Sequence, residues 1–292
     1  MVSDIGFWPG VAGLVVLVLG VAWAWPRLRA ARGIGKFVAL ALAFEGAPLV
    51  AFGVEHMVEG GRMAPMVPSW IPVHVFWIYF VGAALIAAGL SFAAGREVRW
   101  AAPLFALMIA IFEATLTLPS LTEVVKDHTG WVLLFREPGF VGGALALASL
   151  YWLRQRGVLL TVGRVLVAAA VIVFGVVSLR HPEVVPGIPL EKLMPAWYPG
   201  HAWLTPACGV VLLVAGVAML IPKWAWGGAV AAGAVMVMLT AVFYAPLLPA
   251  HGYANLMEAV NYVGDTLLFG ATALLVAMAI ARDSNQVERE AQ

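Results

Sequence analysis

Residues 75–94 read VFWIYFVGAALIAAGLSFAA, a stretch without a single charged side chain. A helix of this length crosses the hydrocarbon core of a bilayer, which is about 30 Å thick. Similar apolar stretches cover residues 8–25, 37–57, 100–119, 132–153, 162–179, 202–221, 225–245 and 260–281. The sequence therefore predicts an all-α protein, a polytopic transmembrane helix bundle of about nine helices.

The composition agrees with a membrane location. Of 292 residues, 63% are hydrophobic and 11% are charged, whereas a soluble domain is about half apolar and about a quarter charged. The net charge is only +1 and no long block of like charges occurs, so the expected partner is the lipid bilayer and no nucleic acid. Cys208 is the single cysteine, which excludes an internal disulfide or a Cys-x-x-Cys redox centre.

Basic residues predict the orientation. Arg27, Arg29, Arg32 and Lys36 follow the first apolar stretch, and the positive-inside rule places this loop in the cytoplasm. The first stretch lacks the basic start and the cleavage site of a signal peptide, so we expect it to be retained as a helix. Most of the 17 lysines and arginines then lie on the cytoplasmic side. The sequence predicts a multi-pass protein of a bacterial cell inner membrane, with a periplasmic N-terminus and a cytoplasmic C-terminus.

One motif occurs twice. Residues 68–74 read PSWIPVH and residues 195–201 read PAWYPGH, in both cases Pro-x-Trp-x-Pro-x-His before an apolar stretch. We interpret this as two parallel four-helix repeats behind one N-terminal helix. The predicted parts are the N-terminal helix with its basic loop (1–36), the first repeat (37–157), the second repeat (158–282) and a polar cytoplasmic tail (283–292).

The repeated motif predicts a rigid loop at the outer membrane interface. Proline biases the residue before it towards extended backbone, and tryptophan favours the level of the lipid head groups. The loop either sets the entry angle of the next helix or contacts a ligand as an outer lid. The residues concerned are Pro68, Trp70, Pro72, Pro195, Trp197, Pro199 and His201.

Ionisable side chains inside the apolar stretches are the candidate ligand-binding residues, because each costs about 2.5–3.5 kcal/mol to insert near a helix centre. They are expected to line a pocket that opens to the outer side. This pocket is predicted from Glu45, Glu55, His56, His74, Glu113, Arg136 and Glu137. Asn261 and Asp265 lie in the last stretch. The histidines all fall at or near the outer ends of the stretches, at His56, His74, His128, His181, His201 and His251.

Three interpretations of these side chains remain open. Arg136 either pairs with Glu113 or Glu137 as a bridge between helices, or belongs to a pocket that binds a small molecule or moves protons. A metal site made from His56, His74 and a carboxylate is the third interpretation. Its ligands would have to come from separate helices, because the sequence has no closely spaced histidine pair.

The segment FGVEHMVEGGRMAPMVPSWIPVHVFWIYFVGAALIAAGLSF at residues 52–92 resembles the DoxX-like family (DoxX/DoxD) of small four-helix membrane proteins. FREPGFVGGALALA at residues 135–148 is similar to the last helix of that family. The resemblance covers residues 37–153 and reaches residues 160–282 only through the internal repeat, so it implies a tandem duplication. The matching residues are Ala64, Pro65, Met66, Val67, Pro68, Trp70, Gly82 and Gly89.

The resemblance implies redox work. Members of this family are associated with membrane oxidoreductase systems, so we expect a membrane oxidoreductase component that binds a quinone-like or small amphipathic molecule in a periplasm-facing pocket. A quinone is the cofactor that this implies, and other membrane or periplasmic redox subunits are the implied partners. The alternatives are a small-molecule or proton-coupled transporter and a non-catalytic assembly subunit of a membrane complex.

Overall fold

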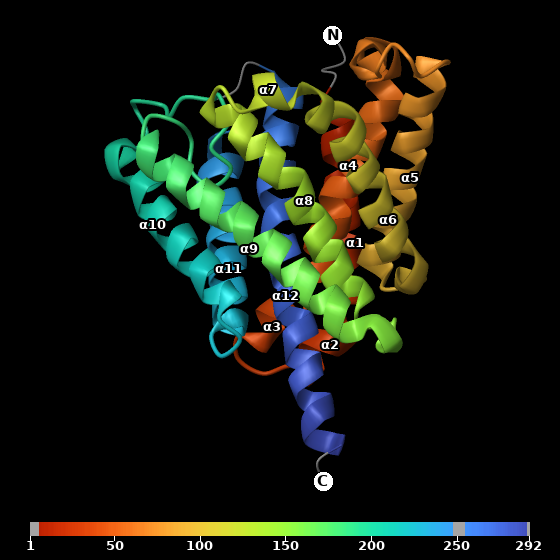
Figure 1. The fold of residues 1–292 in the computed structure, drawn as a ribbon, viewed down its shortest axis with the longest axis vertical. Coiled ribbons are helices and arrows are strands. Elements are labelled where there is room, and N and C mark those ends of the chain that lie inside the picture. The colour runs from red at the N-terminus through yellow and green to blue at the C-terminus, as the bar shows by residue number, and fades with distance from the viewer. Residues whose placement is uncertain (1–5, 248–254, 291–292) are drawn as a thin grey trace. The chain divides into compact units, whose positions relative to one another are not determined.

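A computed structural model describes residues 6–247 and 255–290 (Figure 1). The regular secondary structure in these residues is helical, beside one isolated antiparallel bridge between Val184 and Leu193. The predicted all-α class is confirmed. The α-helices are α1 Phe7–Trp23, α2 Trp25–Ala30, α3 Gly35–Val38, α4 Ala41–Met63, α5 His74–Ala94, α6 Val98–Phe112, α7 Leu121–Val124, α8 His128–Ala148, α9 Arg156–Arg180, α10 His201–Leu220, α11 Ala225–Leu239 and α12 Leu256–Glu290.

Eight helical segments in the described part of the chain are long and apolar enough to cross a membrane. They are Gly35–Met66, His74–Ala94, Val98–Val124, His128–Ala148, Leu153–Arg180, His201–Leu220, Ala225–Leu247 and Leu256–Ser284. The first predicted span forms the shorter apolar helix α1, of 17 residues. Large apolar side chains such as Leu104 and Trp203 lie exposed on these helices, as lipid-facing residues do. The predicted polytopic bundle is confirmed, and His251 lies outside the described residues.

The chain forms two compact units, and unit 1 consists of Met1–Ala101 and Thr240–Leu268. Within it α4 packs against both α1 and α5. The contact between α4 and α5 is made by glycines: a Cβ atom on Gly46 would lie 2.4 Å from the carbonyl oxygen of Gly89, and one on Gly53 would lie 2.7 Å from that of Gly82. Small residues let helix backbones approach closely in a membrane. Gly46, Gly53, Gly82 and Gly89 thus form the packing face between α4 and α5.

Unit 2 consists of Ala102–Leu239 and Phe269–Gln292. Its helices α8, α9, α10 and α11 each pack against the next one along the chain. A cluster of aromatic side chains fills its interior, where the ring of Phe269 lies 4.7 Å from that of Phe174 and 5.6 Å from that of Phe140. All three are buried. Through Phe269, this cluster joins α12 to α8 and α9 within unit 2.

Both copies of the Pro-x-Trp-x-Pro-x-His motif lead into a helix as predicted, since α5 begins at His74 and α10 begins at His201. The residue before each histidine has left-handed backbone, with φ of 58° at Val73 and 76° at Gly200. Trp70 and Trp197 are 71% and 59% exposed, which suits side chains at the head-group level. Whether the loop also contacts a ligand stays a hypothesis.

Two helices end differently from the sequence prediction. The expected spans 100–119 and 225–245 were continuous α-helices, but α6 passes into a π turn, η2 Glu113–Thr117, and α11 passes into another, η5 Thr240–Tyr244. Each π turn is followed by a 3₁₀ turn that contains a proline, η3 Leu118–Ser120 and η6 Ala245–Leu247. Proline has no N–H to continue the α-helical pattern. Single π turns within helices are frequent at functional sites.

Candidate functional site

Two predicted carboxylates are buried on α4 in unit 1. Glu45 is completely buried and Glu55 is 8% exposed. The side-chain amide of Asn261, on α12, donates a hydrogen bond of 3.2 Å to Oε1 of Glu55. Asp265 and Glu59 also act on Glu55 electrostatically. Like charges repel strongly where water is scarce, so this group of side chains is suited to hold a proton or a cation.

The two predicted histidines of unit 1 lie at different levels. Nδ1 of His56 donates a hydrogen bond of 2.7 Å to the carbonyl oxygen of Phe52, within the same helix. A Cβ atom on Gly82 would lie 2.8 Å from Cβ of His56, so His56 packs beside Gly82 of α5. Gly82 comes about two helical turns, roughly 12 Å, after His74 on that helix. Among the described residues no three His, Cys, Asp or Glu side chains form a group that could hold a metal ion. The metal interpretation therefore gains no support.

The other three predicted residues lie together in unit 2. Nε and Nη2 of Arg136 donate to Oε1 of Glu137 at 3.1 and 2.8 Å, and the two side chains are only 19% and 18% exposed. Glu113, the first residue of the π turn η2, is 9% exposed. The hydroxyl of Thr117 and the carboxylate of Glu137 both act on it electrostatically, although its oxygens accept no hydrogen bond of good geometry from the described residues. This group, Glu113, Arg136 and Glu137, is the polar wall below.

The polar wall combines hydrogen-bond acceptors with one cation inside apolar helices. A buried acceptor without a partner costs about 1–3 kcal/mol, and more when it is charged. A polar ligand that donates to Glu113 would remove this cost. The guanidinium of Arg136, held beside Glu137, supplies the positive charge of this group. The polar wall is thus suited to bind a small molecule that has both donor and acceptor oxygens.

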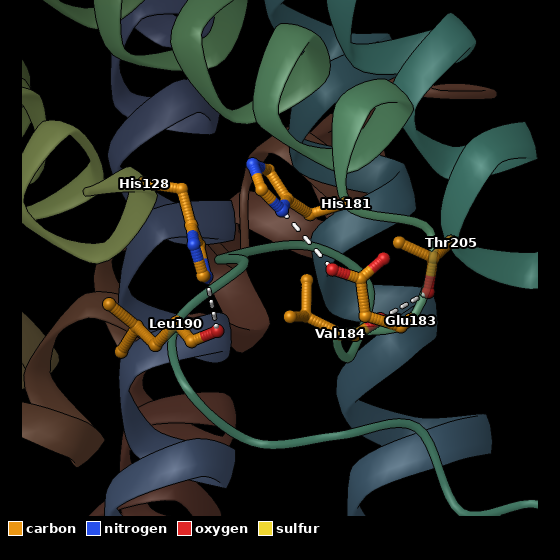
Figure 2. A network of polar contacts seen from close by, with 6 residues as sticks. All are labelled: His128, His181, Glu183, Val184, Leu190 and Thr205. Carbon is orange, nitrogen blue, oxygen red and sulfur yellow. Dashed lines mark hydrogen bonds and ion pairs between the residues drawn. The ribbon is translucent and has the colours of Figure 1, made fainter.

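A second polar site in unit 2 was not among the predicted residues. The rings of His128, on α8, and His181, after α9, stack with centroids 4.2 Å apart. Figure 2 shows that His128 faces the carbonyl oxygen of Leu190 and that His181 faces the carboxylate of Glu183. When two consecutive helices run antiparallel, the second helix ends on the side where the first one begins. The sequence could therefore have predicted that His128, at the start of α8, lies near His181, after the end of α9.

Hydrogen bonds within the segment between α9 and α10, and one from α10 itself, hold Glu183 in place. Its backbone oxygen accepts from the backbone N–H of Met194 at 2.8 Å, and the hydroxyl of Thr205 donates to the carbonyl oxygen of Val184 at 2.6 Å. Bonds from its own backbone N–H and from His181 hold the pKa of Glu183 below its ordinary value. The carboxylate therefore stays ionised at neutral pH and accepts a hydrogen bond from Nδ1 of His181.

Comparison with known proteins adds no further function to this geometry. No protein-family model, curated protein or solved structure matches the chain. The functional assignment therefore depends on the side chains of the two units and on the membrane-spanning character of the helices.

Proposed function

We propose that this chain is a membrane component of an oxidoreductase-type system that binds a quinone-like amphipathic molecule at the polar wall. One observation carries the proposal, namely the buried Glu113 carboxylate at a π turn, near the Arg136–Glu137 ion pair. The quinone oxygens would accept hydrogen bonds from Arg136. The quinol form would donate to Glu113. The resemblance to the DoxX-like family belongs to the same proposal.

In this proposal a partner redox subunit supplies the electrons. Conversion of a quinone to a quinol takes up two electrons and two protons, with one proton added to each quinone oxygen. The single cysteine of this chain cannot exchange two electrons as a dithiol. The role left to the polar wall is to position the quinone and to pass protons to it.

Quinol binding should depend on Glu113. The purified protein is expected to release a quinone on solvent extraction, identified by its absorption spectrum, and to bind a short-chain quinol that is added back. Glu113→Gln should weaken this binding about tenfold, because a hydrogen bond to a charged group contributes about 1.5–3 kcal/mol. The matched control is Glu191→Gln, which neutralises an exposed carboxylate of the same unit. An extract without quinone, together with no binding of added quinol, would leave the non-catalytic assembly subunit as the better assignment.

A second candidate function, proton-coupled transport, is favoured by α4. Glu45 and Glu55 are both buried in one spanning helix, and intramembrane carboxylates are common in proton pathways. In proteoliposomes with an imposed potential, the parent protein is expected to carry protons and Glu45→Gln to abolish that flux. The control is Glu97→Gln, an exposed carboxylate of the same unit. A flux that survives Glu45→Gln, or no flux in the parent, contradicts this candidate.

The location in a bacterial inner membrane is part of the proposal. The basic cluster after α1 supports an N-terminus outside and a C-terminus inside. The stretch from Trp25 to Val38 around this cluster folds as the short helices α2 and α3, which are much shorter than a spanning helix. With this orientation, the stacked histidines of unit 2 face the periplasm.

A further inference from the structure

The stacked histidines lie in a pocket of unit 2 that the proposed quinone site does not use. The pocket has a volume of about 570 Å³ and lies between the start of α8 and the end of α9. That volume is within the range of small-ligand sites, about 300–1,000 Å³. We call it the α8–α9 pocket.

The lining of the α8–α9 pocket has an apolar and a polar part. Val173, Val176 and Val177 on α9 and Trp131 on α8 form the apolar part. They belong to helices that are apolar enough to cross a membrane. A ligand that fits this part carries a hydrocarbon portion or lies beside lipid chains.

The polar part is mainly basic. It consists of Lys126, His128, Arg180 and His181, with Asp127 as the one acidic residue. The carboxylate of Asp127 already accepts the backbone N–H of Gly130 at 2.8 Å and so caps α8. The polar part thus favours an anionic ligand.

Two groups of the polar part remain available to a ligand. Arg180 is exposed at the last position of α9 and has no carboxylate within 4 Å in the described part of the chain. Nε2 of His128 and Nδ1 of His181 face protein oxygens at 3.4 and 3.1 Å. The remaining ring nitrogens, Nδ1 of His128 and Nε2 of His181, make no hydrogen bond with the described residues, so they are free to bind a ligand.

Lys126 is the less available cation. Its ammonium group lies 2.5 Å from the carboxylate of Glu123, and both side chains are well exposed. Arginine binds phosphate oxygens with two parallel N–H bonds, whereas lysine acts as a point charge. Arg180 is therefore the expected anchor of an anion.

We propose that the α8–α9 pocket binds the phosphate of an anionic amphipathic molecule, with the phosphate on Arg180 and the apolar portion against Trp131 and the valines of α9. A phosphate fits because it offers several oxygens to the guanidinium, while a hydroxyl of the same ligand can donate to the two remaining ring nitrogens, which are acceptors in the neutral rings. The phosphate belongs either to an anionic phospholipid or to a soluble phosphate. This site is independent of quinone binding at the polar wall.

The test is thermal unfolding of the full-length protein in detergent with increasing phosphatidylglycerol, phosphatidylcholine or inorganic phosphate. Phosphatidylglycerol is expected to raise the Tm of the parent, since a ligand that binds only the folded state stabilises it. Arg180→Gln should raise the half-saturating concentration about tenfold, the change expected when a charged hydrogen bond of about 1.5 kcal/mol is lost. Arg180→Lys should keep part of the binding. Saturation by inorganic phosphate alone would support the site with a soluble phosphate as its source.

The control is Arg154→Gln, which removes the same charge from an exposed residue just before the start of α9, at its other end. It should bind phosphatidylglycerol like the parent. The proposal would be overturned if phosphatidylcholine stabilised the protein as much as phosphatidylglycerol, or if neither phosphatidylglycerol nor inorganic phosphate stabilised it. An equal loss of binding in Arg154→Gln and Arg180→Gln would also overturn it. Quinone binding is measured separately on the same variants. A failure at the α8–α9 pocket is therefore distinct from a failure at the polar wall.

Discussion

Replacing Gly163 with leucine is expected to prevent unit 2 from folding stably. A Cβ atom on Gly163 would lie 2.4 Å from the carbonyl oxygen of Gly142 on α8 and 2.8 Å from the backbone N of Ala146. The reverse contact is equally close, since a Cβ atom on Gly142 would lie 2.5 Å from the oxygen of Gly163. Because backbone atoms cannot move aside as side-chain ends do, the helices must separate. Overpacking a core commonly costs about 1–3 kcal/mol, and a leucine against backbone should cost more.

The measurement is the yield of monodisperse protein in detergent and its Tm. Gly157→Leu is the matched control on the same helix, because a Cβ atom at Gly157 meets nothing within 4 Å. Gly163→Ala should give an intermediate loss. If Gly163→Leu were as stable as Gly157→Leu, the close approach of α8 and α9 would be wrong. The α8–α9 pocket, which is formed by the same two helices, would then lose its basis.

The spanning helices could be predicted because their signal is local. An apolar stretch such as residues 75–94 has to be a helix in a bilayer, since each backbone N–H and C=O needs a partner there. The glycines of the packing faces could be recognised for the same reason. Small residues spaced along an apolar helix mark a close contact with another helix.

The two π turns could not be predicted from the sequence. A π turn shifts hydrogen bonds by one residue and leaves the hydropathy of the segment unchanged, so the sequence predicts ordinary α-helix at Glu113 and Thr240. Both turns follow helices of 15 residues and precede a turn with proline. We propose that this shared order reflects a tandem duplication.

The residues of the candidate site were chosen from the sequence by their type, and their grouping into units comes from the structure. Depth along a helix can be counted from the sequence at about 1.5 Å per residue. It gives no information on which helices are neighbours. The structure assigns Glu45, Glu55, His56 and His74 to unit 1 and Glu113, Arg136 and Glu137 to unit 2. It also adds Arg180 and the stacked histidines, whose proximity depends on the packing of α8 against α9.

Arg136→Ala is expected to lower the stability of the protein by about 2 kcal/mol. Breaking a fully buried ion pair costs about 3–5 kcal/mol because one charge is left behind, and an exposed pair contributes about 1 kcal/mol or less. The Arg136–Glu137 pair lies between these limits, with side chains that are 19% and 18% exposed. The measurement is thermal or denaturant unfolding in detergent. The control is Arg62→Ala. The side chain of Arg62 is 73% exposed in its pair with Glu59, so this substitution should change stability by less than about 1 kcal/mol.

The double variant Arg136→Ala with Glu137→Gln should recover part of the loss, because the carboxylate left without its cation is then neutral. Arg136→Ala with Glu113→Gln tests the other carboxylate of the polar wall in the same way. The difference between each double variant and the sum of its single variants gives the coupling free energy of that pair. A parent-like stability of Arg136→Ala would mean that the side chain extends its charge to the membrane interface. The polar wall would then lack the cation that is to hold a quinone oxygen, and quinone binding would have to be assigned to other residues or abandoned.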